Sequence, residues 1–391
     1  MISLLFEQFQ TSTLLDWNNL PTFETSNKKS MSTTRHDWTK EEIIAIYNKP
    51  LMELLYEAAT IHREHHDPNV VQISTLISLK TGGCSEDCGY CPQAKRYHTN
   101  IETNPFMTVE DVKVQAVKAK EGGSSRVCMG AAWRNVKDGP EFDQVLEMVR
   151  TINKMDMEVC CTLGMITENQ AQRLAEAGLY AYNHNIDTSE EYYKEVISTR
   201  GFEDRLQTIE NVRKTNITVC SGGIIGMGES IEDRAGMLVA LSTLNPQPES
   251  VPINALVPVE GTPLEAEKSV EIWEMIRMVA TTRIVMPETQ VRLSAGRINW
   301  SREGQAMCFF AGANSIFSGD KLLTTPNNDL NEDMKMFELL GLKNQQPFAK
   351  VDQRESVEAA DSKFTTLGEK PKWSRPGHTI ERNLEATVKG K

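Results

Sequence analysis

The sequence has little cysteine, no excess of positive charge and no long apolar run, and each shortage excludes a class of protein. Eight cysteines in 391 residues are too few for a disulfide scaffold, so they indicate metal or redox chemistry in a reducing compartment. Acidic residues outnumber basic ones by 54 to 42, which disfavours a nucleic-acid binder because contacts to phosphates need a basic surface. No apolar stretch reaches the roughly 18 to 20 residues that span a bilayer. We therefore expect a cytoplasmic protein with no nucleic-acid or membrane partner.

The two ends of the chain differ in composition from its middle. Residues 1–39 begin with an apolar stretch that lacks the basic region and cleavage site of a secretory signal, and the first arginine is Arg35. We predict a mobile N-terminal extension there, with either Met1 or Met31 as the true start. In residues 343–391, Gln, Lys, Glu and Pro dominate and apolar periodicity fades, which predicts a mobile C-terminal tail. The folded domain should span residues 40–342.

Between these ends, short apolar or β-branched runs alternate with amphipathic helical stretches. The sequence predicts eight strands, at 71–80, 124–133, 157–165, 179–187, 217–226, 250–258, 289–296 and 314–320. It predicts helices between most of them, at 109–121, 142–154, 168–177, 202–214, 231–244 and 264–285. Parallel neighbours need crossover connections, so this alternation predicts an α/β fold, a closed (β/α)8 barrel of the TIM type. An open doubly wound sheet is the alternative, because one falsely assigned strand would break closure.

A further helix is predicted before the first strand, at residues 40–65, where it could cap one end of the barrel. Its end carries His62, His65 and His66, and a metal site is one interpretation because His62 and His66 are four residues apart on a helix. We favour a solvated helix end before Pro68, since no acidic or thiol partner is evident.

Three of the cysteines lie together after the first predicted strand. Cys84, Cys88 and Cys91 have the spacing Cys-x3-Cys-x2-Cys, and the neighbouring glycines let the backbone wrap a bulky ligand. Three thiolates can hold three irons of a 4Fe–4S cubane and leave one iron open to another ligand. A zinc site with His98 as the fourth ligand is the alternative. Loops after barrel strands form the catalytic face, which favours a functional site here.

This loop resembles the signature of the radical S-adenosylmethionine (SAM) superfamily. In that superfamily the open iron binds SAM, and one electron from the cluster cleaves it to methionine and a 5′-deoxyadenosyl radical. Tyr90, just before the third cysteine, matches an aromatic position near the adenine. Ile224, in GGIIGMGE, matches an apolar segment that contacts the adenine.

A second group of residues falls three or four positions into separate predicted strands. The group comprises Cys128, Cys160, Cys220 and Arg292. Strand side chains alternate, so at most one of Cys160 and Cys161 points into the barrel. A single free cysteine is most often a small buried hydrophobe, but three at matched depth beside an otherwise unpaired arginine favour a site. Three thiolates and one further ligand would complete a 2Fe–2S cluster.

Several longer stretches resemble the biotin synthase family, and the likeness runs from about residue 40 to residue 341. They include YCPQAKRY, SSRVCMGAAW, AYNHNIDTS, SVPINALVPVEGTPL and VRLSAGR. The resemblance implies 4Fe–4S ligation by Cys84, Cys88 and Cys91, and 2Fe–2S ligation by Cys128, Cys160, Cys220 and Arg292. It also implies that Asp187 contacts the SAM ribose, that Arg205 contacts the SAM carboxylate, and that Asn185 and Asn254 contact the substrate. Cys161 and Cys308 match no ligand position.

The resemblance implies sulfur insertion that converts dethiobiotin to biotin, the last step of biotin biosynthesis, with the 2Fe–2S cluster as sulfur donor. Cofactors carry this chemistry, so no side chain is predicted to be catalytic. Expected partners are dethiobiotin, SAM, an electron donor such as flavodoxin or ferredoxin, and a second copy of the chain. The alternatives are a different radical SAM reaction with one cluster, a non-catalytic iron–sulfur carrier and a zinc protein.

Overall fold

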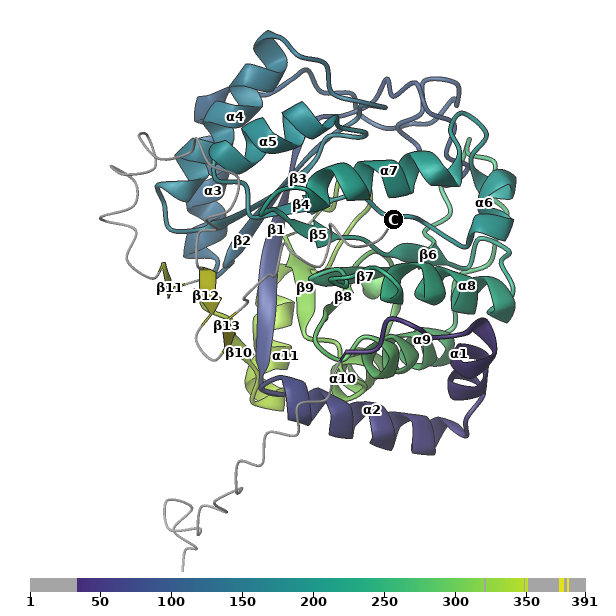
Figure 1. Ribbon diagram of the computed structural model, residues 1–391. Helices are drawn as coiled ribbons and strands as arrows, with labels where there is room; N and C mark the ends of the chain where they lie inside the picture. The colour runs from purple at the N-terminus through teal and green to yellow at the C-terminus, as the bar shows by residue number, and fades with distance from the viewer. Residues whose placement is uncertain (1–33, 320, 348, 351–372, 376–377, 380–391) are drawn as a thin grey trace, which may run out of the picture. The chain divides into compact units, whose positions relative to one another are not determined.

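In the computed structural model, eight parallel strand positions close into a barrel (Figure 1). The structure describes residues 34–319, 321–347, 349–350, 373–375 and 378–379. Around the barrel the strands are β1 (Val70–Lys80), β2 (Arg126–Ala131), β3 (Glu158–Thr162), β4 (Ala181–Asn183), β5 (Thr218–Cys220), β7 (Ser250–Ala255), β8 (Gln290–Leu293) and β9 (Ser315–Ser318). β1 pairs with both β2 and β9, so the sheet has no free edge, and the short β6 (Gly223–Ile225) pairs with β7. The predicted TIM-type barrel is confirmed, and the open sheet is excluded.

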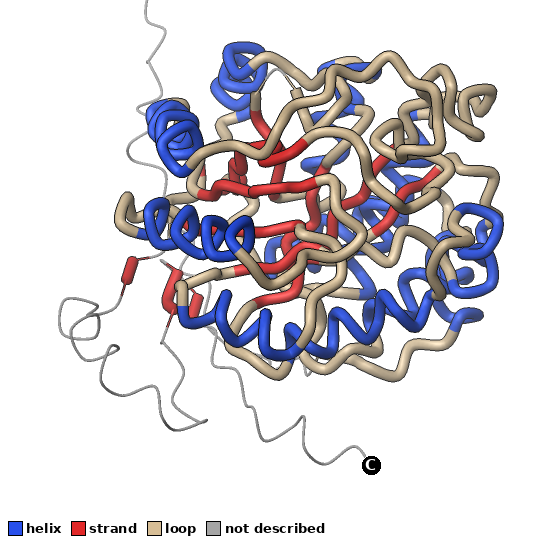
Figure 2. The backbone as a smooth tube through the Cα atoms, turned by 90° about the horizontal axis from the view of Figure 1, so that it is seen from above, coloured by secondary structure: helices blue, strands red, loops and turns tan. Residues whose placement is uncertain are grey.

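Helices follow the strands and surround them, as the view from above shows (Figure 2). They are α3 (Val109–Glu121), α4 (Pro140–Asn153), α5 (Glu168–Glu176), α6 (Glu190–Val196), α7 (Phe202–Arg213), α8 (Ile231–Ser242), α9 (Ile272–Val285), α10 (Arg302–Phe310) and α11 (Leu330–Leu340). Side-chain caps define where several helices begin. Capping boxes are formed by Thr108 at the N-terminus of α3, by Thr167 at that of α5 and by Ser230 at that of α8.

Two of the predicted helices differ in the structure. The predicted helix at 40–65 is two helices, α1 (Lys40–Tyr47) and α2 (Leu51–His65), because Pro50 lacks the N–H that a continuous helix needs. Both pack against the outer ring, α1 on α8 and α9, and α2 on α9. The helix predicted to begin at residue 264 begins at Ile272; turns and irregular backbone precede it, and there the backbone N–H of Leu264 donates to the Gly89 carbonyl in the cysteine loop.

Two of the three histidines at the end of α2, His62 and His66, are packed against other groups, so for them the interpretation of a solvated helix end was wrong. His62 is 1% exposed, and burial lowers its pKa to about 3. His66 Nε2 lies 2.8 Å from Arg283 Nη1 and 2.9 Å from the Pro287 carbonyl oxygen. These rings therefore help to join α2 to the end of α9.

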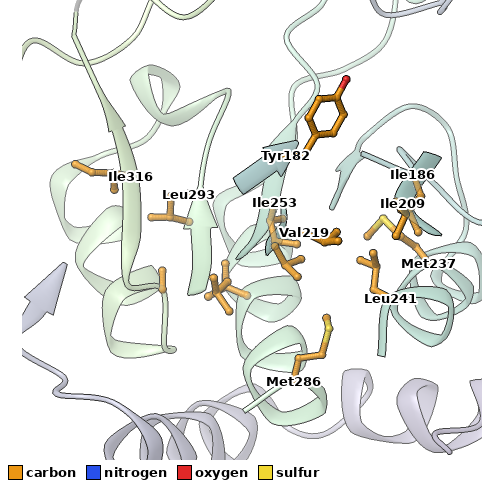
Figure 3. Close-up of a cluster of buried hydrophobic side chains, with 14 of the residues drawn as sticks. Tyr182, Ile186, Ile209, Val219, Met237, Leu241, Ile253, Met286, Leu293 and Ile316 are labelled. Carbon is orange, nitrogen blue, oxygen red and sulfur yellow. The ribbon is translucent and has the colours of Figure 1, made fainter. Parts of the chain in front are cut away.

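Side chains of the barrel strands alternate between two buried layers. Val127, Val159 and Cys161 belong to the outer layer, between strands and helices. Cys128 and Cys160 belong to a separate inner cluster, with Tyr180, Ala181, Leu76 and Phe317. Figure 3 shows part of the outer layer, in which Val219 and Ile253 from the strands share a cluster with Met237 and Leu241 from α8. The alternation therefore separates chemically similar cysteines.

Little is described at the two ends of the chain. β10 (Lys343–Asn344) pairs with the start of β1, so regular structure continues just past residue 342. β11 (Ala349–Lys350), β12 (Trp373–Arg375) and β13 (His378–Thr379) form a small antiparallel sheet. The other residues of the predicted tail, and residues 1–33 of the predicted extension, lie outside the described residues. Within the described chain, no helix combines the length and apolar character needed to cross a membrane.

Candidate functional site

The cysteine loop lies directly after β1 and is held by its own backbone. The N–H of Cys84 donates to the Gln93 carbonyl, and the Cys84 carbonyl accepts from Lys95. Burial raises the pKa of the Cys88 thiol to about 11 and that of Cys91 to about 12, and it also raises the pKa of Cys84. With their pKa values raised, these three thiols are mostly protonated at neutral pH, and a cationic ligand would favour their deprotonation. By contrast, His98 is exposed.

A carboxylate inside the loop fastens it to the segment between α6 and α7. Asp87 accepts hydrogen bonds from the backbone N–H groups of Ser198 and Thr199, at 3.0 and 3.1 Å, and from Arg96 at 3.1 Å. Burial alone would raise the pKa of Asp87, but hydrogen bonds from the hydroxyls of Ser198 and Thr199, together with those from their backbone N–H groups, outweigh burial and lower it to about 2. We call this set of contacts the Asp87 clasp. The sequence analysis did not single out Asp87, although a carboxylate between two cysteines was a visible signal.

Three residues that the resemblance assigns to SAM form one hydrogen-bonded group. The Tyr90 hydroxyl donates to Asp187 Oδ2 at 2.9 Å, and Arg205 Nη2 donates to the same oxygen. Arg205 Nε also donates to the Tyr193 hydroxyl at 2.9 Å. Asp187 has a φ of +70°, a left-handed conformation that is uncommon outside glycine and that clusters at functional sites. The fold thus brings together residues that are 115 positions apart in sequence, from Tyr90 to Arg205.

The two predicted substrate contacts, Asn185 after β4 and Asn254 on β7, both hydrogen-bond to the backbone at the start of β6. Asn185 Oδ1 accepts from the Gly222 N–H at 3.2 Å, and Asn254 Nδ2 donates to the Gly223 carbonyl at 3.0 Å. Ile224 pairs with Asn254 in the sheet register, and its N–H donates to the Asp187 carbonyl at 2.8 Å. A Cβ at Gly222 would lie 2.0 Å from the Pro252 carbonyl oxygen, so only glycine allows this close approach.

The second group of predicted ligands also comes together, inside the barrel. Cys128 and Cys160 are direct partners in the sheet register and hydrogen-bond to each other, and Cys220 is close enough to Cys160 to raise its pKa. The hydrogen bond from Cys160 lowers the pKa of Cys128, with help from Arg292 and Arg126. Arg292 Nη1 lies 3.9 Å from Cys220 Sγ. All four side chains are at most 3% exposed.

Cys161 and Cys308 lie elsewhere, as the sequence analysis predicted from strand alternation and from motif position. Both belong to the outer hydrophobic layer. Burial raises the pKa of Cys308 to about 12 and also raises that of Cys161. These two thiols therefore behave as small hydrophobic side chains.

Polar residues that the sequence analysis did not identify support the inner group. Arg292 donates to Gln72 Oε1 at 2.9 Å and to Ser315 Oγ at 2.8 Å. Asn183 Nδ2 donates to Cys220 Sγ and to Asn185 Oδ1, both at 3.2 Å, and so links the inner thiols to a predicted substrate contact. Only the position of Asn183 in YNHNID, two residues before Asn185, could have pointed to it.

The donor chemistry of both groups fits iron–sulfur clusters. Each offers three thiols, which are the ligands that iron–sulfur clusters take; the three inner thiols are buried, whereas in the loop Cys88 is buried and the other two are partly exposed. Among the residues that the structure describes, no set of three or more His, Cys, Asp or Glu side chains is arranged around a single metal ion. Thiolates of a cluster bind separate irons, so they need not converge on one point.

Comparison with known proteins places two family models on the chain. The Radical SAM superfamily matches residues 78–241, and the Biotin and Thiamin Synthesis associated domain matches residues 252–343. The Radical SAM match contains the cysteine loop and the hydrogen-bonded group of Tyr90, Asp187 and Arg205. The second match contains Asn254 and Arg292.

Curated relatives match over almost their whole length. Biotin synthase of Flavobacterium johnsoniae is 84% identical over 359 residues, which are 92% of this chain and 99% of that protein. The mitochondrial biotin synthase of Arabidopsis thaliana is 57% identical, covering 82% of this chain and 85% of that protein. Among solved structures, methylornithine synthase has a TM-score of 0.66 at 18% identity, covering 82% of this chain and 96% of that one. The hydrogenase maturase HydG of Carboxydothermus hydrogenoformans has a TM-score of 0.68 at 16% identity, covering 83% and 79%; these two likenesses concern the fold.

Proposed function

The chain belongs to the biotin synthase family of radical SAM enzymes, and from that premise we propose how its residues serve sulfur insertion into dethiobiotin. Cys84, Cys88 and Cys91 hold the 4Fe–4S cluster, and Cys128, Cys160, Cys220 and Arg292 hold the 2Fe–2S cluster. When bound, the first supplies the electron that cleaves SAM and the second supplies the sulfur atom. The protein's own part is to bind, orient and exclude water.

Arg205, Asp187 and Tyr90 bind SAM beside the cysteine loop. Arg205 has five donors, two of which go to Asp187 and Tyr193, so its guanidinium retains capacity for a carboxylate. Asp187 accepts from Tyr90 and can exchange that contact for ribose hydroxyls. Ile224, between glycines of β6 and its turn, offers an apolar surface for the adenine.

Asn185 and Asn254 orient the substrate. Dethiobiotin carries a neutral ureido ring with both donors and acceptors, which primary amides match without placing a charge in the barrel. Hydrogen bonds to the glycine backbone fix both side chains, so their orientation is set before the substrate binds.

The barrel wall protects the reaction. Removing hydrogen from unactivated carbon requires a radical, because no side chain is basic enough to take such a proton. The inner thiols are at most 3% exposed, and in the loop Cys88 is buried while Cys84 and Cys91 are partly exposed. The inner group therefore lies away from solvent.

Two partners belong to this proposal. The electron is supplied by a small redox protein such as flavodoxin or ferredoxin, and the chain acts as a homodimer. Both follow from the family resemblance.

The observation that best supports the proposal is the presence of two separate thiol groups in one barrel, one in a loop and one in the wall. The test is an anaerobic assay of the reconstituted chain with dethiobiotin, SAM and a reductant, scored for biotin. Biotin formation is expected. Cleavage of SAM without biotin, together with a single cluster per chain, would favour another radical SAM reaction, and cluster binding without SAM affinity would favour a carrier.

A further inference from the structure

Arg200 is a buried cation with no role in the proposed binding of SAM or substrate. It lies between α6 and α7, and its side chain is 6% exposed. Its Nε and Nη1 atoms have no hydrogen-bond partner among the described residues. Its ion-pair partner is Glu86 in the cysteine loop, with Nε 3.8 Å from Oε1, which is too long for a hydrogen bond. A buried charge with so few partners is costly unless another group compensates it.

The carboxylates around the loop do not balance the arginines. Glu86 also pairs with Arg134 at 3.4 Å and accepts from Thr199, and Asp87 pairs with Arg96 at 3.1 Å. Three guanidinium groups thus face two carboxylates. Arg96 and Arg134 are 52% and 36% exposed, so water screens their charges, whereas the charge of Arg200 is buried. The unbalanced positive charge therefore lies at Arg200.

The field of Arg200 reaches the loop sulfurs. Arg200 pairs with Glu86, which lies in the loop between Cys84 and Cys88. An anion held by these sulfurs would be attracted by the positive charge of Arg200, and the low dielectric of the site would strengthen the attraction.

We propose that Arg200 is the buried counter-charge for the anionic iron–sulfur cluster that Cys84, Cys88 and Cys91 hold. This inference rests on the proposed cluster at those cysteines. Reduction adds one electron to the cluster and makes it more negative, so a fixed cation nearby stabilises the reduced form and raises the midpoint potential. Arg200 thereby makes the cluster easier to reduce by the external electron donor.

The test is a redox titration of the anaerobically reconstituted full chain, monitored by the electron paramagnetic resonance signal of the reduced cubane. Arg200→Gln removes the charge, Arg200→Lys keeps it, and Arg134→Gln removes an exposed charge on the same carboxylate. We expect a more negative midpoint potential for R200Q, a near-native value for R200K and a smaller shift for R134Q. Iron and sulfide contents should stay at the wild-type level.

An unchanged midpoint potential in R200Q at full cluster content would overturn the inference. If R200Q takes up no cubane, the cubane content of R200K distinguishes the explanations. A normal content in R200K would support a requirement for positive charge at this position. Loss of the cubane in both variants would indicate a structural role for Arg200 and would overturn the inference. A different result would disprove the cluster itself: the wild-type chain would then show no cubane signal, whatever the variants show.

Discussion

Single residues of the same type serve different purposes in this chain, and their neighbours decide which. Cys160 and Cys161 are adjacent, yet Cys160 hydrogen-bonds to Cys128 inside the barrel, while Cys161 packs in the outer hydrophobic layer. Asn183 and Asn185 are two residues apart on the same side of the chain and are joined by a hydrogen bond. Strand alternation is the physical cause of both relations.

Replacement of Cys88 by Ala should abolish the cubane and reductive cleavage of SAM, because the cluster loses one of three thiolates. Cys308→Ala is the control, since Cys308 is equally a buried thiol but lies in the outer layer. It should keep the cluster and lose about 1 kcal/mol of stability from the small cavity. Optical spectra and methionine release measure the two effects. Persistent SAM cleavage with a cubane spectrum in C88A would show that the loop assignment is wrong.

Replacement of Cys128 by Ala should remove the 2Fe–2S absorption and leave SAM binding at the loop intact. The control is Cys161→Ala, which alters a thiol one residue from a proposed ligand but in the opposite layer. Iron and sulfide analysis distinguishes the variants: C128A should lose the content of the inner cluster and C161A should not. Equal content in both variants would count against the inner site.

Elements of the barrel are joined by buried charges as well as by apolar packing. Arg126 at the start of β2 pairs with Glu158 on β3 at 2.7 Å and with Glu249, just before β7, at 3.1 Å. Arg126 is fully buried, so these carboxylates compensate its charge where water cannot. The network crosses the barrel interior and connects strands that are not neighbours in the sheet.

Replacement of Glu158 by Ala should therefore lower the free energy of unfolding by about 3 to 5 kcal/mol, because it leaves part of a buried charge without a partner. Glu147→Ala is the matched control, since the pair of Glu147 with Arg150 is about half exposed and should be worth under about 0.5 kcal/mol. Denaturant titration of the cluster-free chain measures both. Equal effects would show that Glu158 is not needed to compensate Arg126.

The Asp87 clasp joins the cysteine loop to the α6–α7 segment, and it predicts a pH dependence. Asp87→Asn should cost about 1 to 3 kcal/mol at neutral pH, because hydrogen bonds to a charged acceptor become hydrogen bonds to a neutral one. The pKa of Asp87 is lowered to about 2 in the fold, so its contribution is present above about pH 4 and is lost as the pH falls toward 2.

The measurement is the difference in free energy of unfolding between wild type and D87N from pH 6 to pH 2.5. This difference should narrow below about pH 4, since only the wild type titrates at this position. A difference that stays constant over the range would mean that the clasp does not depend on the ionised carboxylate.

At the scale of the whole molecule, one barrel carries two thiol groups at different depths. The loop group lies after β1, and the inner group is spread over β2, β3 and β5 with Arg292 on β8. Asn183, Asn185, Asp187 and Arg205 lie in the sequence between Cys160 and Cys220 of the inner group. In the proposed function, this layout separates the site for SAM from the source of sulfur within one closed barrel.

Mössbauer spectra of the freshly reconstituted chain should therefore contain two components, one from a cubane and one from a two-iron cluster. Turnover with dethiobiotin should diminish only the two-iron component, because it is the proposed source of sulfur. A spectrum with the cubane alone would reduce the proposal to a radical SAM enzyme of unknown product.

Local sequence patterns were enough to predict the fold class and the types of ligand that the cysteine loop offers. The Cys84–Cys91 spacing lies within one short loop, and the alternation of strands and helices is a local property, so both could be predicted from neighbouring residues. The sequence also predicted that Cys160 and Cys161 differ, because alternation along a strand needs no tertiary contact. The break between α1 and α2 at Pro50 could also have been predicted from the sequence, but the apolar pattern continues across it and favoured a single helix.

Contacts between residues that are far apart in the sequence depend on the tertiary fold. Barrel closure between β1 and β9 brings Gln72 to Arg292, 220 positions apart, and the Asp87 clasp joins segments 111 positions apart. The burial of Arg200 and of His62 likewise depends on packing by other elements. The periodicity of a sequence predicts on which face of its helix or strand a residue lies. The burial of that residue and the compensation of its charge depend on the other elements that pack against that face.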